Sequence, residues 1–168
     1  EVIRLEFDNP HLHSNKIILA LTEYLQIPMG AIYHLNEDNG IKFLEMVASF
    51  AYGREKQNFK KITMGEGIIG SAASEKKILN LTNVPESYFS IISGYSETKP
   101  RNILISPIKL NEEIFGVIEL ASLNRFKDEE IRFIEEVCKT IAYSFAISKS
   151  YHDTLNMLEL ANSEITQI

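Results

Sequence analysis

Hydrophobic residues near the start of the chain repeat at the spacing of an amphipathic helix. The repeat consists of Ile17, Ile18, Leu21, Tyr24 and Leu25. A serine side chain accepts hydrogen bonds from first-turn N–H groups, so Ser14 is expected to cap the start of this helix. Pro28 is expected to end it, because proline cannot continue a helix. Residues 1–13 are expected to form a lead-in segment on the surface.

Beyond this helix the pattern changes to the alternation of β-strands. Residues 30–36 alternate, residues 36–40 (NEDNG) form a strong hairpin turn, and Ile41–Tyr52 is the returning strand. A polar bend then leads to a third strand over residues 58–63. The first half of the chain is therefore predicted to hold one helix and three strands.

The stretch over residues 65–85 (GEGIIGSAASEKKILNLTNVP) combines a glycine turn, a short amphipathic helix and a short strand. Its glycines also match the G-x-G-x-x-G spacing of dinucleotide-binding loops. That fingerprint requires a buried apolar strand before it, whereas the preceding run NFKKITM is charged and Glu66 would face a pyrophosphate. We therefore interpret the stretch as structural, with Gly70 permitting close packing and with Lys76 and Lys77 in the last helical turn.

The clearest hairpin lies in the second half of the chain, with strands over residues 102–110 and 114–122. Proline lacks the N–H that a strand ladder needs, so Pro107 is expected at a bulge or at an edge. Glu119 stands inside an apolar strand, and two interpretations are open. It faces a polar neighbour or water at the end of the sheet, or it accepts a hydrogen bond from a ligand. The first is favoured, because buried carboxylates are costly unless they are paired.

Residues 86–101 combine aromatic and apolar side chains with serines and a glycine. Such a segment is too apolar to stay in solvent and too interrupted for one long helix, so short helical turns folded over the domain are expected. Aromatic residues with scattered hydroxyls are typical of small-molecule pockets, but they cover bare sheet faces equally well. Composition alone does not separate these two interpretations.

Size and charge limit the classes of function. With 168 residues, of which 45% are hydrophobic and 24% charged, the chain is expected to form a globular domain with one core. A net charge of -6 offers no basic surface to nucleic acid, and no apolar run approaches the about 20 residues of a membrane span. The single cysteine, Cys138, excludes an internal disulfide and a cysteine-based zinc cluster, and no metal site is expected. A cytoplasmic location is expected, as is a longer parent protein, since the chain starts at Glu1.

The last helix is predicted to be longer than the sheet that it covers. It starts near Asp128 and is expected to run to Ile168, about 40 residues or about 60 Å. Beyond Ser148 the apolar spacing alternates by four and three, which is typical of a coiled-coil seam. The seam consists of Tyr151, Leu155, Leu158, Asn162 and Ile165. A buried asparagine at this position favours a parallel two-stranded register, so we expect a homodimer. The alternative is a helix that is ordered by crystal packing or by a further domain.

The order of these elements resembles that of a GAF domain, the small sensory module of signalling proteins. The most specific matches are the 65–85 stretch and SPIKLNEEIFGVIELASLNRFKDEEIRFIEEV, joined by AIYHLNED near the start. The likeness covers residues 14–147 and leaves 148–168 as a C-terminal linker or signalling helix. It implies an α+β fold, PAS-like in layout, with a six-stranded antiparallel sheet in the order 3-2-1-6-5-4. The terminal helices would cover one face, and the short helix and the 86–101 segment would enclose a pocket on the other.

One chemistry of the family is matched in compressed form. Members that bind cyclic nucleotides carry an Asn-Lys, Phe, Asp-Glu signature, which is resembled by Asn124-Arg125, Phe126 and Asp128-Glu129. The same residues fit a structural role, in which Phe126 staples the start of the last helix and the acids stabilise its N-terminus. We favour the structural role.

Other functions known in the family, or in related sensor proteins, have less support from the residues of this chain. Bilin-binding members need a cysteine near the pocket and methionine-sulfoxide-reducing members need several, whereas Cys138 falls on the apolar stripe of the last helix. His34 leaves a haem ligand open, although a core or edge histidine is favoured. The run HDTLN from His152 resembles the phosphoacceptor motif of sensor kinases, but the proline that usually follows is missing, so a solvated histidine is favoured.

The function expected from the resemblance is that of a non-catalytic sensory or regulatory module. A small molecule would bind under the 86–101 segment, and the long helix would pass the signal to a C-terminal effector domain, with a homodimer formed through the N- and C-terminal helices. The candidate ligand-binding residues are Tyr33, Asn80, Tyr88, Phe89, Tyr95, Arg101, Asn102 and Glu119. Arg101 is the natural partner of an anionic ligand, but the sequence names neither a ligand nor a cofactor. The alternatives are a ligand-free dimerisation module and an enzyme, for which no nucleophile–base pair is visible.

Overall fold

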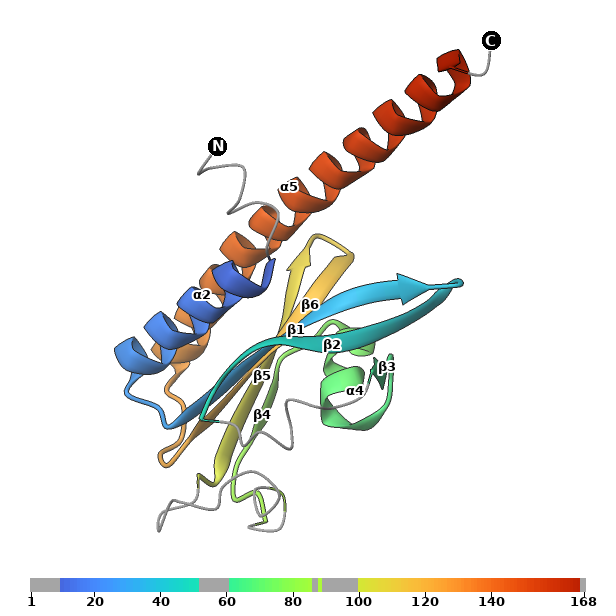
Figure 1. Cartoon of the computed structure of the whole chain (residues 1–168). Helices are drawn as coiled ribbons and strands as arrows, with labels where there is room; N and C mark the ends of the chain where they lie inside the picture. The colour runs from blue at the N-terminus through green and yellow to red at the C-terminus, as the bar shows by residue number, and fades with distance from the viewer. Residues whose placement is uncertain (1–9, 52–60, 86–87, 89–99, 167–168) are drawn as a thin grey trace.

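The computed structural model describes residues 10–51, 61–85, 88 and 100–166. These residues form an α+β domain around one sheet (Figure 1). In chain order the elements are α2 (Pro10–Leu25), β1 (Met29–Asp38), β2 (Ile41–Phe50), β3 (Ile62–Thr63), α4 (Gly67–Glu75), β4 (Leu79–Leu81), β5 (Asn102–Leu110), β6 (Glu113–Ser122) and α5 (Asp128–Thr166).

The six strands form one antiparallel sheet in the order β3-β2-β1-β6-β5-β4, which confirms the topology implied by the resemblance. The helices α2 and α5 lie on one side of it, and α4 lies on the other (Figure 1). The first hairpin turns at Asn39 and Gly40, whose φ angles of 50° and 79° are the left-handed values that a tight turn with matching twist requires. The long strands β1 and β6 are neighbours at the centre, where each is supported on both sides.

The face under α2 and α5 is packed by aliphatic and aromatic side chains. Its core includes Ile18 of α2, Ile118 and Leu120 of β6, and Ile134 and Ile141 of α5. All five side chains are fully or almost fully buried, and burial of this kind contributes about 1.5–3 kcal/mol for each large aliphatic side chain. This face therefore supplies most of the apolar burial that joins the terminal helices to the sheet.

The start of α5 is built as the sequence indicates. Phe126 is buried in the core beneath the helix, beside the partly buried Ile131. The Lys127 N–H donates to the Glu130 carboxylate at 2.8 Å, and the Ile131 N–H donates to the Lys127 carbonyl. The Glu130 contact is one half of a capping box, and Phe126 and Ile131 occupy the two positions of a hydrophobic staple, which supports the structural interpretation of Phe126.

On the other face, α4 packs its small residues against the sheet. Ile69, Ala72 and Ala73 are buried there against Met29 and Ile103, among others. Gly70 must lack a side chain, because a Cβ at this position would collide with the Thr63 carbonyl oxygen. The predicted role of Gly70 in close packing is thus confirmed.

Several element ends differ from the sequence-based expectation. The first helix begins at Pro10 rather than Ser14, because proline is well suited to the first helical turn. Ser14 is therefore buried inside the helix and does not cap it. The helix ends at Leu25, before Gln26 with its positive φ of 52°, and not at Pro28. Lys76 and Lys77 are not in the last turn of α4 but follow it, with Lys76 as the C-cap at a left-handed φ of 56°.

The helix α5 is 39 residues long and continues well past the sheet (Figure 1). Its first half covers β5 and β6, and its second half projects from the body of the domain. The length expected from the sequence is therefore confirmed as far as Thr166. No helix among the described residues is long and apolar enough to cross a membrane.

Candidate functional site

A buried carboxylate lies at the centre of the sheet, on the face that carries α4. Glu119 of β6 pairs with Ala31 of β1 on one side and with Ile105 of β5 on the other. Its exposed fraction is 1%, so water does not solvate it as a residue at the end of the sheet would be solvated. The small Ala31 side chain beside it leaves room for larger polar partners on this face.

Two tyrosine hydroxyls supply those partners. Tyr33 donates to Oε2 of Glu119 at 3.1 Å, and Tyr88 donates to Oε1 at 3.0 Å. Burial, followed by the nearby Glu119, raises the pKa of both phenols well above their usual value. Each phenol therefore keeps its proton at neutral pH and remains a hydrogen-bond donor. Hydrogen bonds to a charged group contribute about 1.5–3 kcal/mol each, so the pairing offsets much of the cost of burying Glu119.

The two tyrosines reach Glu119 from elements of different kinds. Tyr33 is held inside β1, two residues beyond Ala31 and thus on the same face of the strand. Tyr88 lies in the connection between β4 and β5, where its N–H donates to the Pro85 carbonyl at 3.0 Å in a single turn. One donor is therefore fixed by the sheet, while the other depends on a local turn.

The structure thus brings together three of the candidate ligand-binding residues and places two others, Asn80 and Asn102, on the opposite face of the sheet. Asn80 pairs with Leu104 and so faces the α2/α5 side, where it is exposed. Asn102 is on that side too, and its amide donates to the Leu123 carbonyl at 3.1 Å, which positions the chain that leads to α5. Arg101 is exposed at the start of β5. The predicted Phe89 and Tyr95 lie outside the described residues.

The family resemblance placed Tyr33, Tyr88 and Glu119 in one candidate pocket, but sequence reasoning did not predict that both phenols hydrogen-bond to the carboxylate. Tyr33 and Glu119 are 86 positions apart, and Tyr88 and Glu119 are 31 apart. Only the β1–β6 register, with Tyr33 opposite Val117, places the phenol of Tyr33 over the neighbouring Glu119. The one available signal was the interruption of an apolar strand by a single carboxylate.

Cys138 lies on the other face of the sheet from Glu119. Its thiol is buried against β5, and burial raises its pKa to about 12. At neutral pH the group is an enclosed thiol rather than a thiolate, and the thiolate is the nucleophilic form. This placement agrees with the expectation that Cys138 packs as a small hydrophobe.

The histidines with a suggested role are also away from Glu119. His34 faces the α5 side, with its ring edge-on to that of Phe145 at 4.9 Å and its Nδ1 3.0 Å from the Asn36 side chain. His152 is exposed on the projecting half of α5, beside Tyr151. Within the described parts of the chain, no three His, Cys, Asp or Glu residues are grouped so that they could hold a metal ion.

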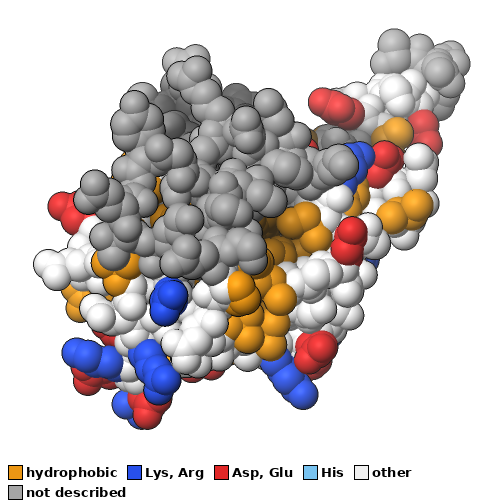
Figure 2. Space-filling view, turned by 90° about the horizontal axis from the view of Figure 1, so that it is seen from below, with side chains coloured by type: hydrophobic (Ala, Val, Ile, Leu, Met, Phe, Trp, Pro, Cys, Tyr) orange, Lys and Arg blue, Asp and Glu red, His pale blue; other side chains and the backbone are white. Residues whose placement is uncertain are grey.

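The five seam residues all lie on the projecting half of α5. Leu158 and Ile165 expose 55% and 71% of their surface, and Asn162 is also exposed. Tyr151 and Leu155 are half-buried. In Figure 2 this end of the helix shows orange hydrophobic side chains among white and red ones. Such exposure of large apolar residues on a single helix is unusual unless a partner covers them.

Comparison with known proteins agrees with this fold. A family model for the GAF domain matches residues 14–146. The chain is similar to the GAF domain of a phosphoenolpyruvate-protein phosphotransferase (ptsP) from Coxiella burnetii, with a TM-score of 0.70, 17% identity and coverage of 90% of this chain and 92% of that one. It is also similar to the second GAF domain of DevS from Mycobacterium smegmatis, with a TM-score of 0.65, 12% identity and coverage of 84% and 96%.

A third similar structure is an enzyme. It is the free methionine-R-sulfoxide reductase from Neisseria meningitidis in complex with its substrate, with a TM-score of 0.63, 16% identity and coverage of 84% of this chain and 80% of that one. The comparison with curated proteins gave no match. At these identities the structures establish the fold alone, while the family model covers most of the sequence. The chain therefore belongs to the GAF domain family.

Proposed function

We propose that this GAF domain is a non-catalytic sensory module that binds a small molecule at the cluster of Tyr33, Tyr88 and Glu119. The observation that supports it is the burial of Glu119 with a separate phenol on each carboxylate oxygen. Buried carboxylates are rare unless they are paired, and clusters of this kind are concentrated at functional sites. The cluster also lies on the α4 face, where the resemblance places the family's pocket.

The geometry favours a ligand that presents hydrogen-bond donors. Glu119 offers only acceptor oxygens, and Tyr33 is fixed in β1, so the replaceable partner is Tyr88. A ligand amine, amide or hydroxyl would take the place of the Tyr88 phenol on Glu119. Phe89, Tyr95 and Arg101 remain predicted contacts for the rest of such a ligand.

The same strand connects this site with the long helix. Glu119 is flanked in β6 by Ile118 and Leu120, whose side chains are buried on the opposite face, beneath the terminal helices. A ligand that moves β6 would therefore change the packing under α5. Coupling of this kind requires that the ligand bind the two arrangements with different affinity.

The projecting half of α5 is the proposed route to an effector domain and the proposed dimer contact. An uncharged stripe runs along the helix, with successive members three or four residues apart. It consists of Phe133, Val137, Thr140, Ser144, Ile147, Tyr151, Leu155, Leu158, Asn162 and Ile165. Near its start Phe133 packs on Tyr24 of α2, with ring centroids 5.0 Å apart. Farther on, most members of the stripe are exposed and Tyr151 and Leu155 are half-buried, and a second copy of the helix would cover them.

The absence of catalysis is part of the proposal. Cys138, the one cysteine of the chain, is enclosed between α5 and β5 on the face opposite Glu119. The phenols of Tyr33 and Tyr88 hold their protons tightly, which suits donors and not bases. A ligand-free dimerisation module remains the competing function, and the experiment below separates the two.

Native mass spectrometry of the purified protein tests both parts at once, because it reports subunit number and retained small molecules. The expected result is a dimer with a reproducible additional mass. That mass should be lost in Glu119→Gln and kept in the control Glu159→Gln, which changes an exposed glutamate on α5. An empty dimer would favour the ligand-free module, and a monomer would contradict the proposed contact.

A second pair of variants tests the dimer face. Leu158 lies on the uncharged stripe, whereas Leu160, which exposes 66% of its surface, lies off it. Leu158→Glu should therefore dissociate the dimer, and Leu160→Glu should leave it intact. Equal effects of the two variants would contradict the stripe as the contact.

A further inference from the structure

We propose a second binding site, for an anionic small molecule, in a cavity between α5 and the end of β5. The cavity has a volume of ≈ 570 Å³, within the range of about 300–1,000 Å³ that is usual for small-molecule sites. It is on the α5 side of the sheet, away from Glu119, and is independent of the function proposed above. Lys77, Lys109, Glu135 and Cys138 are among its lining residues.

The cavity arises because β4 is much shorter than β5. The strand β4 begins at Leu79, which pairs with Ile105, so the residues of β5 beyond Ile105 extend past its start. The α4–β4 connection, with Lys77, closes the space on one side, and α5 closes it on another. Strand length and helix position, rather than a local sequence motif, therefore produce the hollow.

Its walls are strongly basic for a chain with a net charge of -6. Four lysines line the cavity, and Glu135 is the one acidic residue among its described lining residues. The lysines are Lys76, Lys77, Lys109 and Lys139. A concave surface with one sign of charge concentrates ions of the opposite sign. The charge therefore points to an anion.

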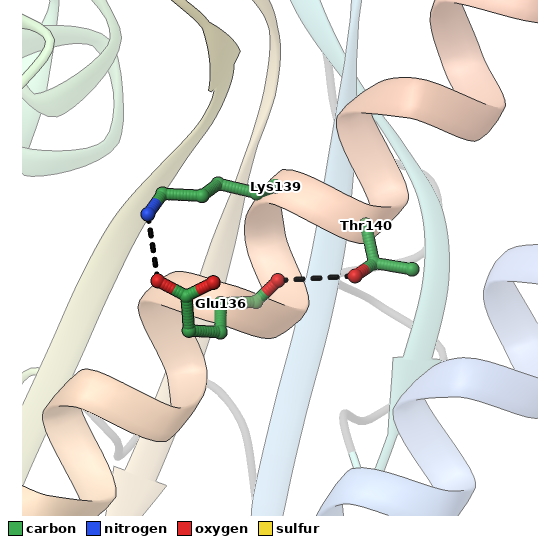
Figure 3. A network of polar contacts seen from close by, with 3 residues as sticks. All are labelled: Glu136, Lys139 and Thr140. Atoms are coloured by element: carbon green, nitrogen blue, oxygen red, sulfur yellow. Dashed lines mark hydrogen bonds and ion pairs between the residues drawn. The ribbon is translucent and has the colours of Figure 1, made fainter.

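Two of these lysines are already paired. Lys139 and Glu136 point toward one another on α5, with Nζ and Oε1 2.6 Å apart (Figure 3). Lys76 is 3.4 Å from Glu112. In the described part of the chain, Lys77 and Lys109 form no such ion pair. These two ammonium groups, which come from different elements, are the proposed anchors of the ligand.

The floor of the cavity determines what else the ligand carries. Ser106 and Cys138 are buried there and hydrogen-bonded to each other, next to the apolar Pro107 and Leu110. A ligand with a compact apolar or planar part and an anionic group fits this combination. An added peptide strand fits less well, because Pro107 offers no N–H to a partner strand. The proposed class is therefore a phosphorylated or carboxylated metabolite rather than an acidic peptide.

Isothermal titration calorimetry with pyrophosphate and with AMP, at constant ionic strength, tests the site. Pyrophosphate measures the anionic part alone, and AMP adds a planar part to it. Both probes should bind, and AMP should bind more tightly. The double variant Lys77→Gln/Lys109→Gln should weaken binding about tenfold. Lys77→Arg/Lys109→Arg should keep it within about threefold, because the charges remain.

Matched control variants distinguish binding in the cavity from non-specific attraction of the anion to positive charge. Arg125→Gln/Lys127→Gln removes the same amount of charge from exposed residues outside the cavity and should leave the affinity unchanged. Glu135→Gln should tighten binding about threefold by removing the opposing carboxylate. Tyr33→Phe, at the other site, should have no effect.

Two outcomes would overturn the proposal. In the first, neither probe binds at millimolar concentration, which would mean that the lysines and Pro107 serve only to protect an open strand edge. Alternatively, the control pair weakens binding as much as the cavity pair, in which case the attraction is non-specific. Circular dichroism of each variant confirms that the fold is retained before the titrations are compared.

Discussion

The face of the sheet under α2 and α5 and the face under α4 bury different kinds of side chain. The first encloses a large aliphatic and aromatic core that includes Ile118 and Ile141. The second encloses Glu119 with its two phenols, among smaller residues such as Ala72 and Ala73. Among the buried side chains in the described ranges, the one carboxylate is that of Glu119, on the second face.

Under the proposed function, the difference between the two faces separates stability from ligand recognition. Apolar burial is non-directional and cannot readily be exchanged, so it stabilises the arrangement of α2, α5 and the sheet. A hydrogen bond to Glu119 can be exchanged for one from a ligand at small net cost, because the two are of the same kind. Under the proposed function, the α4 face would exchange hydrogen-bond partners while the apolar face keeps the domain folded. The predictions below test this contrast, from the largest expected effect to the smallest.

Truncation of the apolar face should cost the most stability. Ile118→Ala and Ile141→Ala remove fully buried side chains and leave cavities, so each should lower the free energy of unfolding by about 2–5 kcal/mol. Urea denaturation followed by circular dichroism measures the change. Leu160→Ala is the control, since Leu160 is 66% exposed, lies off the uncharged stripe and should change stability by less than about 0.5 kcal/mol. Similar losses for Ile141 and Leu160 would show that α5 is not packed as described.

Removal of the buried carboxylate should have an intermediate effect. Glu119→Gln keeps the shape but leaves one acceptor oxygen for two phenols, so unfolding should become easier by about 1–3 kcal/mol. The exposed Glu159→Gln should stay within about 0.5 kcal/mol of the parent in the same urea titration. A more stable Glu119→Gln protein would mean that Glu119 is strained in the folded state and is kept for binding alone.

Removal of single phenol hydroxyls should cost less than removal of their shared acceptor. Tyr33→Phe and Tyr88→Phe should each lower stability by about 1–2 kcal/mol, with Tyr33 the larger because it is the more buried. In combination with Glu119→Gln, each should lose most of its effect, because the acceptor is already impaired. Additive losses in this double-mutant cycle would show that the tyrosines contribute through packing and not through Glu119.

The smallest effect expected is on the pH dependence of stability. The phenol pKa values of Tyr33 and Tyr88 are raised in the folded state, so their contribution is present below pH 10 and is lost as the pH rises further. Each phenol adds up to about 1.4 kcal/mol per pH unit to the loss above that pH. Tyr33→Phe should make the decline shallower in urea titrations above pH 10.

The buried thiol of Cys138, on the other face, should also make the free energy of unfolding depend on pH in the alkaline range. The pKa of Cys138 is raised from 9.0 to about 12, so its contribution begins to fall one pH unit earlier, above pH 9. Cys138→Ala should flatten the curve between pH 9 and 10, whereas Tyr33→Phe should not. If Tyr33→Phe instead of Cys138→Ala flattened the curve between pH 9 and 10, the burial of these two side chains would be contradicted.

Much of the fold could be predicted from local pattern. The two hairpins, the glycine turn before α4 and the length of α5 follow from periodicity and turn residues, which depend on neighbours in the chain. The ends of α2 and α4 were less predictable, because several neighbouring residues can each begin or end a helix. The structure begins α2 at Pro10 and caps α4 at Lys76. Pro107 was placed correctly near a bulge, because the β5–β6 register shifts between Ile108 and Lys109.

The sequence by itself determined which side chains are available: a carboxylate in an apolar strand, tyrosines among the pocket candidates, and lysines after the short helix. The tertiary structure alone decided which of them meet. Strand register brings Tyr33 to Glu119 and carries Asn80 and Asn102 to the other face. The short β4 opens the space that Lys77 and Lys109 share. Side-chain chemistry is a local property that the sequence records, whereas proximity across 86 positions depends on how strands pair and where they end.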